Sequence, residues 1–139
     1  MEKKLEDLLN LLLEAERAGV QALRGMSEET ADPEVKALFQ YFSEVEVKDC
    51  ATLEKLIHDH GGTPSTKTGD FAEKVLNLDS LHDQMNLLSR GQAWTARKVE
   101  QALALKPPPQ IAAFLEEMAN RHRHHMEWAR AEAIKAFDE

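Results

Sequence analysis

The sequence has few of the features that mark secreted, membrane or disulfide-bonded proteins. Its 139 residues include a single cysteine, Cys50, which excludes an internal disulfide and is typical of a reducing compartment. No stretch approaches the ~20 apolar residues that a membrane helix needs. Glu6 and Asp7 interrupt the apolar region that a signal peptide would require. We therefore expect a cytoplasmic protein that does not contact a membrane.

Basic clusters and the motifs of several common enzyme classes are missing as well. The formal net charge is −8 and no run is rich in Lys and Arg, which disfavours nucleic acid as a partner. The sequence has no Ser-His-Asp arrangement, no phosphate-binding glycine loop and no Cys-x-x-Cys. Cys50 follows an acid, Asp49, whose charge disfavours a reactive thiolate, so we interpret it as a core residue.

The residues that are present favour an all-α protein with a single domain over residues 1–139. Hydrophobic residues make up 42% of the chain and charged residues 30%, as is usual for a soluble helical protein. Apolar residues recur at helical spacing in four long segments, which we predict as helices over residues 3–25, 33–60, 80–105 and 110–137. The long connection between the second and third helices contains a capping-box pattern at Asp70 and Glu73, which predicts a short helix. Such a connection can return the chain along a four-helix bundle.

Polar residues interrupt the apolar stripe near the middle of each long helix. These residues are Glu16 in the first helix, Glu46 and Asp49 in the second, Gln92 in the third, and His122 and His125 in the fourth. An ionised carboxylate among apolar side chains costs several kcal/mol unless it is paired or bound to a metal. Counting from the turn between the last two helices puts Gln92 and His122 at about the same height. We therefore expect the polar groups to converge.

Small residues lie on one side of the first helix around Gly19. Glycine lowers helix propensity by about 1 kcal/mol relative to alanine. We therefore expect Gly19 to allow the close approach of a neighbouring element.

Three short motifs resemble the ferritin-like superfamily, and in particular an uncharacterised bacterial ferritin-like domain of unknown function. They are Glu14-Ala-Glu16-Arg17-Ala-Gly19, Arg90-Gly91-Gln92-x-Trp94 and His60-Gly61-Gly62-x-Pro64. The resemblance covers essentially the whole chain. It implies a ferritin-like four-helix bundle whose long crossover, with its short helix, joins the second and third helices. In di-iron members, two helices each give one Glu and the other two each give Glu-x-x-His.

The sequence matches only part of this family pattern of metal ligands. The matching positions are Glu16 in the first helix, Glu46 in the second and His122 in the fourth. Asp49 stands where a His is expected, while Gln92 and Ala119 each stand where a Glu is expected. The resemblance therefore implies a degenerate site that lacks a complete di-iron centre.

Two functions follow from these observations. The one that Gln92 and Ala119 favour is a bundle of unknown function with a metal-free, hydrogen-bonded core. In that core the acids would be neutralised by Gln92, by His122 or His125 as imidazolium, or by Arg17, Arg97 or Arg121. Such a protein would act through its surface, and a homodimer is expected because ferritin-like domains often pair.

The alternative is a metal-binding oxidoreductase, or a protein that handles peroxide or oxygen. Its ligands would be Glu16, Glu46, Asp49 and His122, with His125 as a further ligand and Gln92 lining the site. Carboxylates and imidazole suit iron, manganese or zinc without selecting among them; we expect iron or manganese, with one ion per chain or none. His124 points away from the other two histidines on a helix, so we leave it out.

Overall fold

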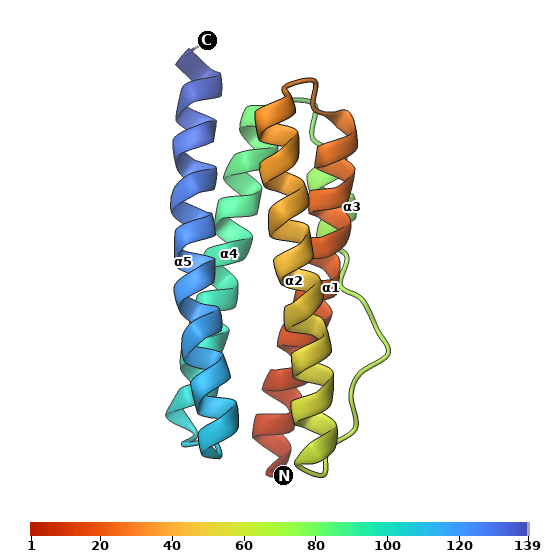
Figure 1. The fold of residues 1–139 in the computed structure, drawn as a ribbon, viewed down its shortest axis with the longest axis vertical. Coiled ribbons are helices and arrows are strands. Elements are labelled where there is room, and N and C mark those ends of the chain that lie inside the picture. Colours follow the sequence, from red (N-terminus) through yellow and green to blue (C-terminus); the bar gives the residue numbers. More distant parts are fainter. Residues whose placement is uncertain (139) are drawn as a thin grey trace. The chain divides into compact units, whose positions relative to one another are not determined.

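The computed structural model describes residues 1–138, and these residues are all-α. Five helices occur among them: α1 (Lys3–Glu29), α2 (Pro33–Asp59), α3 (Phe71–Leu76), α4 (Leu81–Ala104) and α5 (Pro109–Asp138) (Figure 1). No strand is found in this range, so the predicted all-α class is confirmed, as is the short helix in the crossover. The chain divides into two compact units, Met1–Leu76 and the remainder from Asn77 onward, which are described one at a time. The prediction of a single domain stays a prediction.

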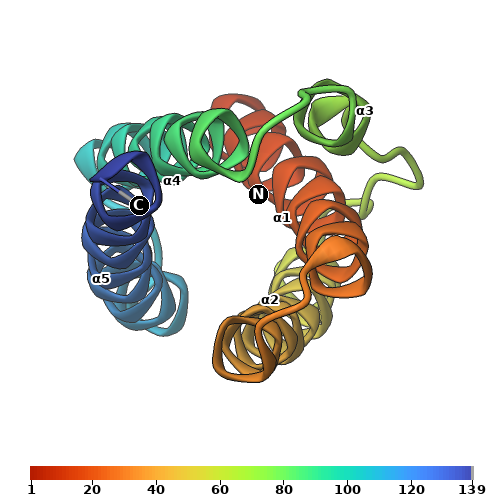
Figure 2. The ribbon, with the colours of Figure 1, turned by 90° about the horizontal axis from the view of Figure 1, so that it is seen from above.

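The first unit pairs α1 with α2, which lie side by side and run in opposite directions, while α3 packs on α1 (Figure 2). Pro33 opens α2, and the side chain of Asp32 accepts a hydrogen bond from the backbone N of Glu34 at 2.9 Å. This is the helix start that the sequence predicts. The stop is also as predicted, because Gly61 follows α2 with a φ of 87°, a value that glycine adopts readily. The large, fully buried side chains of this unit are Leu9, Leu12, Leu13, Leu23, Met26, Phe39, Leu53 and Ile57.

The predicted end of α1 at Gly25 is wrong, because the helix continues to Glu29. Met26 and Ser27 are buried, so tertiary packing favours another helical turn after the glycine. A Cβ at position 25 would lie 2.6 Å from Cδ1 of Leu76 in α3. Gly25 therefore serves the close packing of α3 against α1 and does not end the helix.

The crossover, residues 61–70, is held against α1 by hydrogen bonds. Asn10 donates from Nδ2 to the backbone O of Thr63 at 3.0 Å, and its Oδ1 accepts from the backbone N of Ser65 at 2.7 Å. Further along, the backbone N of Gly69 donates to the backbone O of Glu14 at 3.2 Å. These bonds satisfy backbone groups that have no partner in a helix or strand.

Arg17 fastens the middle of the crossover. Its Nη1 donates to the backbone O of Ser65 and of Lys67, at 2.7 and 2.9 Å. Its Nη2 forms an ion pair of 2.7 Å with Glu54 of α2. The expectation that Arg17 reaches inward to neutralise the buried acids is therefore wrong, because its guanidinium is engaged by the crossover and by Glu54.

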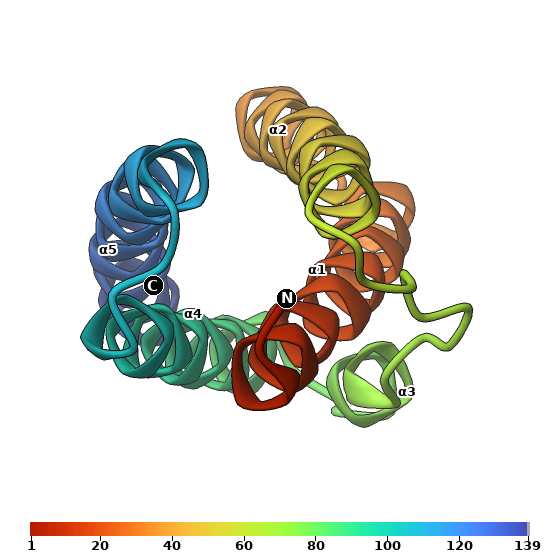
Figure 3. The same ribbon diagram turned by 90° about the horizontal axis from the view of Figure 1, so that it is seen from below.

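The second unit consists of α4 and α5, which pack antiparallel and are joined by a short turn (Figure 3). The hydroxyl of Ser80 caps α4 by accepting from the backbone N of Asp83 at 3.1 Å. Lys106 in the turn has a φ of 54°, and α5 begins at Pro109, one residue before the predicted start. The large, fully buried side chains of this unit are Met85, Ile111, Leu115 and Met118. None of the described helices of either unit is long and apolar enough to cross a membrane.

Candidate metal centre

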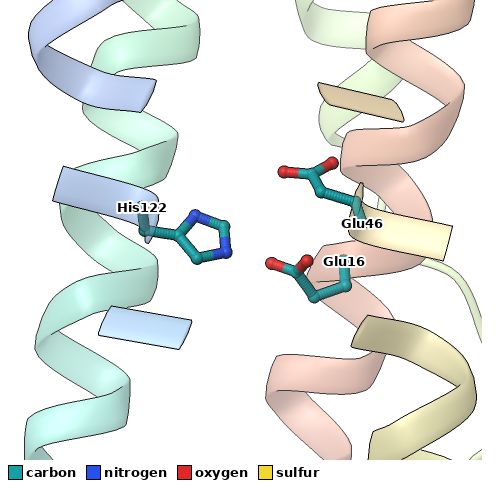
Figure 4. Close-up of side chains that lie close together, drawn as sticks. All are labelled: Glu16, Glu46 and His122. Carbon is teal, nitrogen blue, oxygen red and sulfur yellow. The ribbon is translucent and has the colours of Figure 1, made fainter. Parts of the chain in front are cut away.

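Two carboxylates of the first unit lie close together. Glu16 projects from α1 and Glu46 from α2, each with a relative exposure of 1% (Figure 4). An oxygen of one carboxylate lies within 4.8 Å of an oxygen of the other. The convergence expected for these two acids is confirmed. Like charges at this separation repel, and burial strengthens the repulsion because the surroundings are less polarisable than water.

Gly19 makes room for this arrangement. It lies one turn after Glu16 on α1, and a Cβ built at this position would lie 3.1 Å from Cδ of Glu46 and closer still to its Oε2. Real Cβ atoms essentially never show so short an approach to a neighbour, so any larger residue would displace the carboxylate. The close approach that the small-residue side of α1 predicts is therefore to the carboxylate of Glu46.

Asp49 adds a third buried acid one turn beyond Glu46, with a relative exposure of 4%. The neighbouring residue, Cys50, is only partly buried, so its interpretation as a core residue is only partly right. Burial, followed by the charges of Glu16 and Glu46, raises the pKa of the Cys50 thiol to about 12. Cys50 is therefore a neutral thiol at physiological pH, as its acidic neighbour suggests.

In the second unit, His122 of α5 is buried and hydrogen-bonded to Gln92 of α4. The imidazole Nδ1 donates and the amide Oε1 of Gln92 accepts. The equal height predicted for these two residues is confirmed by this bond. An amide oxygen only accepts, so Nδ1 carries the hydrogen and Nε2 carries the lone pair of the neutral ring. Figure 4 shows the ring of His122.

His125 lies one turn beyond His122, with ring centroids 6.0 Å apart and a relative exposure of 9%. Burial is the main cause that lowers the pKa of His125, to about 4, and the nearby His122, Arg121 and His124 lower it further. The suggestion that His125 neutralises the acids as an imidazolium is wrong, since it is neutral at physiological pH. Arg97 is exposed, and Arg121 lies over the ring of Phe114, 5.9 Å from its centroid.

The role of Gln92 is the feature that sequence reasoning missed. The family pattern marks it as a poor replacement for a carboxylate ligand, whereas the structure makes it the partner of a histidine. The available signal was the matching height of Gln92 and His122, which indicates contact but not which atom of the ring is engaged.

The family model described as Domain of unknown function (DUF6306) matches residues 3–132. The chain belongs to this family. No curated protein matches this DUF6306 chain. A solved structure similar to it is described as a crystal structure of ferritin-like, diiron-carboxylate proteins from Bacillus anthracis str. Ames. The TM-score is 0.84 at 19% sequence identity, and the match covers 96% of this chain and 99% of that one. The ferritin-like fold expected from the resemblance is thereby confirmed for this DUF6306 member.

Proposed function

We propose that this DUF6306 protein binds one iron or manganese ion through Glu16, Glu46 and His122. The observation that carries the proposal is the buried pair of Glu16 and Glu46. Glycine at position 19 leaves the space that the Glu46 carboxylate occupies. Two buried carboxylates at this separation are strongly unfavourable as anions unless positive charge compensates them. A divalent cation supplies that charge and takes oxygen ligands readily.

The chemistry of His122 supports it as the third ligand. The bond from Nδ1 to Gln92 leaves the lone pair on Nε2, and a neutral imidazole nitrogen is a common ligand of iron and manganese sites. The ferritin-like fold supports bringing this residue to the acids of the first unit, since the similar solved structure is described as a diiron-carboxylate protein. Asp49, one turn from Glu46, is the fourth ligand that we propose, and His125 stays a predicted further ligand.

The residues fit one ion better than two. A pair of ions needs bridging carboxylates, but position 92 offers an amide whose oxygen is engaged by His122, and Ala119 has no donor atom. The proposed donor set is therefore three carboxylates and one imidazole, with His125 as a predicted further ligand.

The chemistry of such a site follows from its burial and charge. A bound iron ion would supply an open position for oxygen or peroxide. The carboxylates of Glu16 and Glu46 would bind the ion as anions. Because both are buried, bulk water would be kept from the ion. In the metal-free protein, the Cys50 thiol keeps its proton at physiological pH because its pKa is about 12.

A metal-free polar core is the second candidate. The observation in its favour is that Gln92 and His122 satisfy each other without an ion. In that case Glu46 would act on stability whether or not metal is supplied.

The experiment that separates the two is elemental analysis of untagged protein from cells grown with iron and manganese. We expect about one ion per chain in the wild type and less than about a tenth in Glu46→Gln, because the substitution removes a charged ligand. Glu44→Gln, two residues away on the exposed face of α2, is the matched control and should keep its metal. Wild-type protein without metal, together with a change in the melting temperature of Glu46→Gln in chelator, would favour the metal-free core.

A further inference from the structure

We infer that Gln92 is a positioning residue that fixes the ring of His122 so that Nε2 is the ligand atom. The inference rests on the proposed metal site and deepens it. It gives a function to one of the two residues that stand where the family pattern has a Glu.

The geometry of the bond sets the tautomer. Gln92 Oε1 accepts from His122 Nδ1, and both side chains are buried, with relative exposures of 5% and 2%. In the orientation that the Gln92 amide has here, the other tautomer would place a bare Nδ1 against the carbonyl oxygen, which is repulsive, and burial denies both atoms water as a replacement. The bond also restricts rotation of the ring about its own axis.

A histidine that binds a metal commonly donates its second ring N–H to a carboxylate, a carbonyl or water, and this contact raises its basicity and fixes its orientation. The amide oxygen of Gln92 meets this requirement and adds no negative charge to the second unit. Helix α4 holds the acceptor and α5 holds the ring, so the packing of these two helices determines the direction of Nε2.

The first measurement is the tautomer of His122 by nitrogen NMR of the imidazole groups, in metal-free protein with chelator present. We expect the Nδ1–H form in the wild type and its loss in Gln92→Leu, which has no acceptor. Gln101→Leu, on the exposed face of the same helix, is the control and should keep the wild-type tautomer.

The second measurement is the affinity for Fe(II) and Mn(II) by titration of the same proteins. Gln92→Leu should bind about 10–100-fold more weakly, as is typical when the partner of a ligating histidine is lost. Gln92→Glu, in contrast, should bind the ions about as tightly as the wild type, because a carboxylate oxygen can accept the same hydrogen. If the leucine variant does not fold, Gln92→Asn replaces it, since its amide is one methylene short of the ring.

The outcomes separate this inference from the function on which it rests. An Nε2–H tautomer in the wild type, or unchanged affinity in a folded Gln92→Leu or Gln92→Asn, would overturn the role of Gln92. A wild type that binds no metal but shows the Nδ1–H form, lost in the variant, would overturn the proposed function while supporting the orientation of His122 by Gln92.

Discussion

The missing side chain of Gly19 leaves room for the carboxylate of Glu46 beside α1. Replacing this glycine should raise the helix propensity of α1 by about 1 kcal/mol. The added methyl group would overlap the carboxylate of Glu46, which lies at the far end of a flexible side chain and has to move aside. The net change in the free energy of unfolding should therefore be small, whereas the carboxylate of Glu46 is moved from its position.

We therefore predict that Gly19→Ala changes the unfolding free energy of the metal-free protein by less than about 2 kcal/mol while abolishing metal binding. Urea unfolding in chelator and elemental analysis test the two halves of this prediction. Gly69→Ala is the control, because a Cβ there would meet only ordinary contacts of 3.6 Å. Wild-type metal content in Gly19→Ala would show that the site does not depend on the position of Glu46.

His125 makes stability depend on pH. Its pKa is lowered from 6.5 to about 4 in the folded protein, so between these values the unfolded chain binds more protons than the folded one. The contribution of His125 to the free energy of unfolding is therefore fully present above about pH 6.5 and is lost as the pH falls toward 4.

We predict that the wild type loses of order 1–3 kcal/mol of stability through this residue between pH 6.5 and pH 4. His125→Gln should lose less over the same range, as measured by urea unfolding of metal-free protein. The exposed His124→Gln should behave as the wild type does. Parallel pH profiles of wild type and His125→Gln would contradict the burial of a neutral imidazole.

The helix ends could largely be read from the sequence because their determinants are local. Asp32 and Pro33 start α2, Ser80 starts α4, and Gly61 follows the end of α2. Gly25 was misleading because glycine serves two purposes, ending helices and admitting close neighbours. The contact with Leu76 that decides between them joins residues far apart in sequence, which no local pattern shows.

The fastening of the crossover to α1 was likewise hidden from the sequence. Asn10 bonds to backbone groups 53 and 55 residues away, and such partners become known only from the fold. We predict that Asn10→Ala destabilises the protein by about 1–2 kcal/mol, since it removes two hydrogen bonds to backbone groups. Urea unfolding measures this loss.

Glu14→Ala is the control for that prediction. Glu14 holds the crossover through its backbone oxygen, which survives truncation of the side chain. A loss of stability as large in Glu14→Ala as in Asn10→Ala would contradict the assignment of the effect to the crossover bonds.

At the scale of the whole molecule, the sequence predicted the ferritin-like fold, while its choice of site residues stays a prediction. Stripe interruptions mark Glu16, Glu46 and His122 because a polar residue among apolar ones stands out. The interruptions do not show that Gln92 is hydrogen-bonded to His122 or that Arg17 is hydrogen-bonded to the crossover. Both contacts depend on the positions of individual atoms in the fold. The number of ions that we propose likewise depends on which atoms are already hydrogen-bonded.

A bound ion should stabilise the folded protein, because it binds side chains that the unfolded chain does not bring together. At a concentration 100 times the Kd, it should stabilise the folded protein by about 2.7 kcal/mol. We predict that metal slows amide hydrogen exchange in α1 and α2, and that His122→Ala in α5 removes this protection. His124→Ala should keep it. Protection of α1 and α2 that persists in His122→Ala would mean that the acids bind the ion without the second unit.

The bonds that hold the crossover also bear on how the chain meets a protease. Lys67 lies in a segment without helix, where trypsin would ordinarily cut. Its backbone N donates to the Ser65 hydroxyl and its backbone O accepts from Arg17. A protease that draws an extended strand into its cleft has to break these bonds first. We therefore expect the peptide bond after Lys67 to resist trypsin for as long as Arg17 of α1 stays bonded to the crossover.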